Sequence, residues 1–290
     1  MSIVEEIKSS FKFGSMLTKL IYINLGVFIV YNLLRFFLFM GGIPSDSLVY
    51  YLAVPASPAA LLHRPWTLLT YMFFHEGFIH ILFNMLWLFW FGKLFLQFLS
   101  NRQLLGVYLL GGISGAILYI VAFNVLPVFS GQALLSVALG ASASVLAIVV
   151  AVSTLRPNYE IYLLFLGAVK LKYLAIATIV LDVISIPMSN AGGHIAHLGG
   201  AIFGYTYIKL LASNVDMANF LKVFSEIKIP NFSRRSKMRV TYTKEESDYD
   251  YNYRKAQEQK EIDKILEKIA RSGYESLTKA EKELLFKMKK

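Results

Sequence analysis

Long apolar stretches with few charged residues dominate the chain up to about residue 212. A helix needs roughly 20 such residues to cross the hydrocarbon core of a bilayer. The pattern predicts six membrane-spanning helices, in the ranges 20–40, 77–99, 103–125, 141–155, 171–187 and 195–212. The fourth range is short for a complete crossing, so we expect its helix to begin partway through the membrane, beside a cavity.

The chain changes character on either side of these stretches. The expected parts are an N-terminal cytosolic segment at 1–16 that could form an interfacial helix, a membrane domain at 17–212, a linker at 213–257 and a small helical cytosolic tail at 258–290. In the tail, apolar residues follow helical spacing over 262–269, and Ser272-Gly273 interrupts the pattern. Thr278 and Glu281 then predict the capping box of a second short helix.

Basic residues gather in alternate connections between the predicted helices. They precede the first helix, flank the join of the second and third, lie between the fourth and fifth, and follow the sixth. Of the other connections, only the one after the first helix holds a basic residue, Arg64. Since basic residues stay on the cytoplasmic side, both termini are expected there. That arrangement requires an even number of spans, and six satisfies it.

Composition supports a membrane protein and excludes other classes. Apolar residues make up 56% of the 290 positions and charged residues 17%, whereas a soluble domain is about a quarter charged. The chain has no cysteine, which excludes disulfides, thiol nucleophiles and cysteine-ligated zinc. Topology and attraction to anionic lipid account for the net charge of +10 better than nucleic acid does, so no nucleic-acid partner is expected.

Polar residues interrupt the start of the second predicted helix. His80 and Asn84 are four residues apart, so they share one helix face, and both can donate hydrogen bonds. Polar groups at membrane depth are costly and therefore suggest function, although hydrogen bonding between helices is the simpler explanation. His75 and His80 are five apart, whereas a zinc-protease helix needs histidines four apart. We expect no metal and no cofactor.

A second polar group, Gly140-Ala141-Ser142, opens the short fourth helix. Glycine allows a tight turn and close approach of the backbone. A serine there would sit beside the free backbone N–H groups of a helix N-terminus, which can stabilise an oxyanion. The simpler alternative is that the small residues only allow close packing between helices.

A third group lies on the sixth predicted helix. Small residues recur every fourth position and form a stripe suited to close helix packing, at Gly192, Ala196, Gly200 and Gly204. His197 sits on the margin of this stripe. Taken alone, it could equally be a buried histidine with its hydrogen bonds satisfied.

Together the three groups can form the site of a serine nucleophile. A serine alcohol is weak until a base takes its proton, and His197 can be that base if the fourth and sixth helices pack together. His80 and Asn84 can then donate to the developing negative charge. Asp182 is the only acid deep in the fourth to sixth helices, and it lies on the fifth. The sequence therefore favours a Ser–His dyad without a third member.

These motifs resemble the rhomboid family of intramembrane serine proteases over roughly residues 17–212. H-x-x-x-N, G-x-S and G-x-x-x-A-H-x-x-G-x-x-x-G appear in the family's order. The resemblance implies an all-α, six-transmembrane-helix bundle with Ser142 as nucleophile and His197 as general base. His80, Asn84 and the Ser142 backbone would form the oxyanion hole, with His75 and Gly140 in supporting roles.

The resemblance also implies an activity and a place for it. The protein would cleave transmembrane protein substrates in or near a membrane helix, within the lipid bilayer. A bacterial cytoplasmic membrane is the expected location, and the tail is similar to one appended to some bacterial rhomboids. The sequence specifies neither the substrate nor the oligomeric state.

Two departures from the family pattern lie close to the serine. Ala143 stands where many members have glycine, and Leu146 stands where many have an aromatic ring. Neither change removes a reacting group, so an active enzyme is expected. The alternatives are a non-catalytic rhomboid-like protein that binds membrane helices and, less favoured, a small proton-coupled transporter. The absence of matching half-repeats in the sequence disfavours the transporter.

Overall fold

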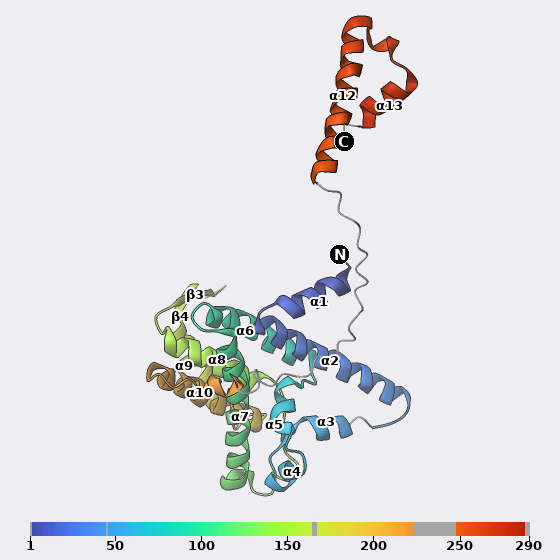
Figure 1. The fold of residues 1–290 in the computed structure, drawn as a ribbon. Helices are drawn as coiled ribbons and strands as arrows, with labels where there is room; N and C mark the ends of the chain where they lie inside the picture. The colour runs from blue at the N-terminus through green and yellow to red at the C-terminus, as the bar shows by residue number, and fades with distance from the viewer. Residues whose placement is uncertain (1, 45, 164–166, 223–247, 288–290) are drawn as a thin grey trace. The chain divides into compact units, whose positions relative to one another are not determined.

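The computed structural model describes residues 2–44, 46–163, 167–222 and 248–287. They fall into two units, Met1–Ile229 and Pro230–Lys290, each considered by itself (Figure 1). The expected all-α class is confirmed, because helices dominate both units. The domain boundaries expected from the sequence stay predictions, and most of the expected linker lies outside the described residues.

Six helices of the first unit occupy the six ranges predicted to span the membrane. Three of them are long and apolar enough to cross a bilayer: α2 (Met16–Met40), α6 (Phe78–Leu96) and α7 (Asn101–Val125). The others are α8 (Ser142–Leu155), α9 (Leu171–Ser185) and α10 (Ala191–Ala212). Helix α8 is apolar but short, as predicted, while the total of six spans stays a prediction.

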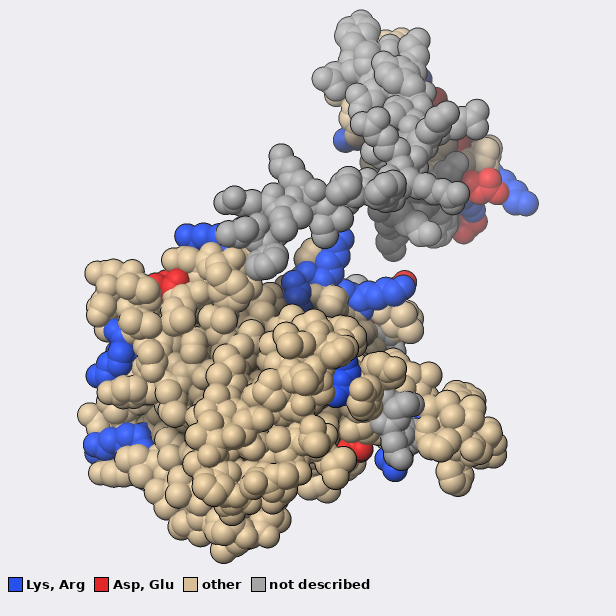
Figure 2. Space-filling model, turned by 90° about the horizontal axis from the view of Figure 1, so that it is seen from below, with Lys and Arg blue, Asp and Glu red and all other residues tan. Residues whose placement is uncertain are grey.

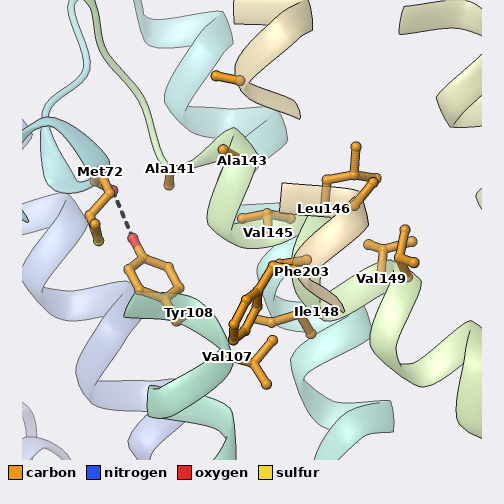
Figure 3. Packing of buried hydrophobic residues seen from close by; sticks show 14 of the residues in the cluster. Met72, Val107, Tyr108, Ala141, Ala143, Val145, Leu146, Ile148, Val149 and Phe203 are labelled. Carbon is orange, nitrogen blue, oxygen red and sulfur yellow. Dashed lines mark hydrogen bonds between the residues drawn. The ribbon is translucent and has the colours of Figure 1, made fainter. Parts of the chain in front are cut away.

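Helix α8 is the centre of the bundle, and α6, α7, α9 and α10 all pack against it. Every residue from Ala143 to Ser153 is buried. A helix that is apolar on all sides belongs in a core, which explains this placement. Figure 3 shows α8 side chains packed near Val107 and Phe203, with the Tyr108 hydroxyl donating to the Met72 carbonyl at 2.8 Å.

One face of this unit is largely uncharged. In the view of Figure 2, uncharged residues cover most of the face, and Lys and Arg are scattered over it. Large apolar side chains stand exposed on the outer helices, including Phe37, Phe83, Trp90, Val180 and Ile202. Such exposure would be costly in water, whereas lipid accommodates it.

Short elements connect the long helices. Before α2 lies α1 (Ile3–Phe13), which begins in a capping box between Ser2 and Glu5. Between α2 and α6 lie α3 (Asp46–Leu52), β1 (Val54–Pro55), α4 (Pro58–His63), α5 (Thr67–Thr70) and the 3₁₀ turn η1 (Tyr71–Phe73). Between α7 and α8 lie η2 (Pro127–Phe129) and β2 (Val137–Ala138), and between α8 and α9 lie β3 (Glu160–Leu163) and β4 (Gly167–Lys170).

Two antiparallel strand pairs occur among these connections. Strand β1 pairs with β2, with Val54 opposite Ala138, and β3 pairs with β4 as a hairpin. The β1–β2 pair fixes the segment that leads into α8. Its backbone is held further because the Gly140 N–H donates to the Tyr71 carbonyl at 2.9 Å.

A polar cluster joins the end of α10 to the start of α7. Asp216, just before the turn η3 (Met217–Asn219), accepts hydrogen bonds from Tyr207 at 2.9 Å and from Arg102 at 3.1 Å. Burial alone would raise the pKa of Asp216. The hydrogen bonds from Tyr207, the Ala218 N–H and Arg102 outweigh burial and hold that pKa below its usual value.

The described part of the second unit is a helical hairpin. It consists of α12 (Asp248–Ser272), η4 (Tyr274–Ser276) and α13 (Lys279–Lys287). The predicted capping box is confirmed, since Thr278 and Glu281 exchange hydrogen bonds. Lys268 also binds Glu281 at 2.9 Å and, with Thr278, lowers the pKa of Glu281 to about 2. Helix α12 begins at Asp248, inside the expected linker.

Candidate functional site

A cavity of about 580 Å³ opens between α6, α8, α9 and α10. Its lining is mostly apolar, with a smaller set of polar residues: His80, Asn84, Ser142, Thr178, Asp182, Asn190 and His197. Four of these, His80, Asn84, Ser142 and His197, come from the three motifs identified in the sequence. The structure therefore brings residues from separate helices to one cavity, of the size that ligand sites usually have.

Ser142 is the first residue of α8. The preceding Ala141 provides no side-chain cap, so the first N–H groups of the helix are left to other partners. The positive end of the helix dipole lies here, which favours negative charge beside the serine. The described residues show no hydrogen bond between Ser142 Oγ and His197, although both line the cavity.

Gly140 turns the chain into α8 and lies against a histidine. Its φ of +117° belongs to a region that residues with side chains rarely adopt. A Cβ at this position would lie 2.7 Å from Cε1 and 2.9 Å from Nε2 of His80. The same Cβ would be 3.7 Å from Ser142 Oγ. Glycine is therefore needed for both the backbone angle and the approach of His80 to the serine.

His75 accepts a hydrogen bond from the turn that leads into α8. Its Nε2 accepts a hydrogen bond from the Ala141 N–H at 3.2 Å, and its ring meets that of His80 edge to face with 5.1 Å between centroids. His75 lies in the loop before α6 and is fully buried. Burial, with a smaller contribution from His80, lowers the pKa of His75 to about 4, so His75 is neutral near pH 7.

His80 and Asn84 lie on the first turns of α6 and face the cavity. The Asn84 amide donates one hydrogen to the His80 carbonyl at 2.9 Å, four residues back. An amide has a second N–H hydrogen, which leaves Asn84 a donor for another group. Both side chains therefore line the same cavity as Ser142 and carry groups that can donate hydrogen bonds.

Asp182 of α9 binds His197 of α10. The Nδ1 atom of His197 lies 2.8 Å from Asp182 Oδ1, and the Nδ1 atom of His194 lies 2.8 Å from the same oxygen. A carboxylate accepts, so each imidazole donates from Nδ1 and keeps Nε2 as an acceptor. That tautomer of His197 is the one a base needs to take a proton.

The stripe of small residues on α10 contacts two neighbouring helices. A Cβ on Gly192 would lie 2.8 Å from the Tyr119 ring of α7. A Cβ on Gly200 or Gly204 would lie 2.1 Å or 2.2 Å from the carbonyl oxygens of Ala143 and Ala147 in α8. Ala196 lies in the same stripe, and its carbonyl oxygen faces Gly115 of α7. This close contact brings His197 and Ser142 to one cavity.

Sequence reasoning gave Asp182 no role because the residue lies on a different helix from Ser142 and His197. A signal was nevertheless present. Asp182 is close to the end of α9, and His194 and His197 are close to the start of α10, with a short connection between them. Two helices joined by a short turn run antiparallel, which places these residues at the same level.

Comparisons with known proteins agree with this architecture. A family model described as "Rhomboid domain" matches residues 62–214, which is more than half of the chain. A second model, described as a family of unknown function (DUF6576), matches residues 245–287 of the tail. The rhomboid match covers five of the six helices and all three motifs.

Two curated proteins are similar to the chain. The presenilin-associated rhomboid-like protein A, mitochondrial, of Danio rerio is 32% identical over 163 residues, or 55% of this chain and 40% of that protein. The RHOMBOID-like protein 12, mitochondrial, of Arabidopsis thaliana is 33% identical over 147 residues, or 48% of this chain and 44% of that protein. The chain thus spans less than half the length of each.

Both relatives are mitochondrial by name and come from eukaryotes, so they do not support the bacterial cytoplasmic membrane expected above. They do agree with the apolar helices in indicating a membrane protein. The extent of the domain match, together with the three motifs around one cavity, establishes that the chain belongs to the rhomboid family.

Proposed function

We propose that this protein is an intramembrane serine endopeptidase that cleaves transmembrane protein substrates in or near a membrane helix. The observation that carries the proposal is the single cavity lined by Ser142, His197, His80 and Asn84. Membership of the rhomboid family supports it, because that family includes serine proteases. No cofactor is required for this chemistry.

The reaction begins with attack of Ser142 Oγ on the carbonyl carbon of the substrate's peptide bond. Nε2 of His197 takes the serine proton as the new C–O bond forms. The imidazolium then gives that proton to the leaving amine, and the peptide C–N bond breaks. A water molecule, activated by the same histidine, hydrolyses the acyl-enzyme and restores the Ser142 hydroxyl.

The tetrahedral intermediate carries a negatively charged oxygen that needs donors. His80, Asn84 and Ser142 line the cavity. In this proposal, the His80 ring, the Asn84 amide and the Ser142 N–H at the start of α8 donate hydrogen bonds to that oxygen. Removing one such donor typically costs about 10²–10³ in rate. His75 and Gly140 are supporting residues, because they hold the turn and the position of His80.

Asp182 is a positioning residue in this proposal. It binds Nδ1 of His197, so that Nε2 stays free to take the serine proton. It would also stabilise the imidazolium that forms during the reaction. The reacting pair remains Ser142 and His197.

The test is cleavage of a model transmembrane helix by the purified full chain in liposomes. We expect the wild type to cleave it, and Ser142→Ala and His197→Ala to be inactive. Ser144→Ala is the matched control, since Ser144 is fully buried two residues further along α8 and should keep activity when replaced. Cleavage that survives Ser142→Ala would overturn the proposal. Folded wild-type protein that binds the helix without cutting it would instead identify a non-catalytic rhomboid-like binder.

A further inference from the structure

Asp182 binds two imidazoles with one oxygen, and only one of them is used by the proposed reaction. His194 and His197 lie three residues apart on α10, so they share a helix face, and Asp182 reaches them from α9. Their ligand atoms all lie within 4.8 Å of one another. Asp182 is buried, whereas the two histidine side chains are 22% and 23% exposed.

This donor set is that of a divalent transition metal. Two imidazole nitrogens and a carboxylate oxygen are ligands that Zn²⁺ takes in catalytic sites, where a fourth position stays open to water or substrate. Asp182 and His197 line the cavity, so an ion held there has a path of entry and room for a fourth ligand. The site is distinct from the His75–His80 pair, whose spacing fails the zinc-protease pattern.

We propose that Asp182, His194 and His197 form a binding site for a divalent transition-metal ion of the Zn²⁺ class. In the ion-free state, two N–H groups fill the space between the carboxylate and the imidazoles at 2.8 Å. An ion takes the place of those hydrogens. The ligand atoms must move apart by a fraction of an ångström to surround it at about 2.0–2.2 Å.

Occupancy of the site would stop the proposed hydrolysis, a consequence that rests on the proposed function. A metal on Nδ1 of His197 leaves the ring's proton on Nε2, which faces away from the ion. That nitrogen can then no longer accept the proton of Ser142. The bound ion therefore acts as an inhibitor, and its removal by a chelator returns His197 to the tautomer that a base requires.

Binding is tested first, by titrating the purified full chain with Zn²⁺ alone against a competing chromophoric chelator. We expect one ion per chain, and binding weakened by more than about 10-fold in both His194→Ala and Asp182→Asn. His63→Ala is the control for adventitious histidine binding, since His63 is exposed on α4, and should bind as the wild type does. Equal Zn²⁺ binding by wild type and His194→Ala would overturn the proposal. Melting temperatures of the variants separate ligand loss from misfolding.

Inhibition is tested second, through the rate at which a fluorophosphonate probe labels the serine. Zn²⁺ should slow labelling of the wild type, and a chelator should restore it. His194→Ala should be labelled at the same rate with and without Zn²⁺, because each form is compared with its own metal-free rate. Inhibition of wild type and His194→Ala at the same Zn²⁺ concentration would contradict the assignment. If no form is labelled while Zn²⁺ still binds as expected, the proposed function fails and the metal site stands.

Discussion

Gly140 shows how one residue shapes the candidate active site. Its φ of +117° and the His80 ring against its α-carbon both exclude a side chain. The loop preceding α8 contains a second glycine with positive φ, Gly131 at +80°, but a Cβ there meets nothing within 4 Å. Comparing substitutions at Gly140 and Gly131 therefore separates the effect of backbone strain from the effect of contact with His80.

Replacing Gly140 with alanine should displace His80 from beside Ser142. We expect Gly140→Ala to slow fluorophosphonate labelling by about 10²-fold or more, the loss typical of one missing oxyanion donor. Gly131→Ala should cost only backbone strain, about 1–2 kcal/mol, and keep its labelling rate. Equal labelling of the two variants would show that the closeness of His80 to Gly140 has no catalytic importance.

Asp182 can be tested in the same way. Asparagine in its place would donate to Nδ1 of His197 and so stabilise the tautomer with its proton on Nε2. In a serine protease triad, such a change costs about 10⁴ in rate. We expect Asp182→Asn to slow labelling by up to about 10⁴-fold with an unchanged melting temperature and to shift the pH profile of labelling.

The control for Asp182 is Glu160→Gln, which removes an exposed carboxylate of the same unit and should change nothing. Labelling of Asp182→Asn at the wild-type rate and with the wild-type pH profile would leave Ser142 and His197 as a pair that needs no carboxylate.

Among the elements, α8 and α10 depend on each other for their positions. Gly200 and Gly204 let the backbone of α10 touch that of α8, where a Cβ would lie about 2 Å from carbonyl oxygens. By contrast, Gly26 of α2 is a helical glycine in open space, since a Cβ there meets nothing within 4 Å.

Gly200→Ala should therefore force α8 and α10 apart. Overpacking typically costs 1–3 kcal/mol, and we expect about 3 kcal/mol here because the obstacle is backbone. Gly26→Ala should be neutral or stabilise by up to about 1 kcal/mol. Thermal unfolding in detergent measures both. Equal melting temperatures would contradict the packing of α10 on α8.

The helices were largely predictable from the sequence, and the connections between them were not. Long apolar runs gave the ranges of α2, α6, α7 and α10 to within a few residues. Strands β1 and β2 have two residues each, too few for a periodic pattern. They pair although α6 and α7 lie between them in the sequence. Their register depends on helix packing, which no local signal contains.

The candidate site was partly predictable for the same reason. Ser142, His197, His80 and Asn84 belong to short motifs whose spacing is visible in the local sequence, and they line one cavity. Asp182 of α9 binds His197 of α10, so this contact depends on how the two helices pack and not on a local motif. Helix α12 begins earlier than expected, at Asp248, and the exposed Arg254–Glu258 pair, four residues apart, adds modest support to it.

At the scale of the whole molecule, the membrane domain should cross the bilayer so that both ends of the chain lie on the same side. The absence of native cysteine makes this simple to test, because each introduced cysteine is unique. Ser9→Cys on α1 and Ser272→Cys at the end of α12 should react with a membrane-impermeant maleimide from the same side of sealed vesicles. Ser130→Cys, before β2, should react only from the opposite side. Reaction of Ser9→Cys and Ser272→Cys from opposite sides would contradict an even number of spans.

The central claim is that Ser142 is a nucleophile activated by His197. The most direct measurement is covalent labelling of the purified full chain by a fluorophosphonate, compared among wild type, Ser142→Ala and His197→Ala. The account predicts that the wild type is labelled and that both variants lose the label while keeping their folded state. Labelling that persists in Ser142→Ala, or a folded wild type that is never labelled, would contradict it.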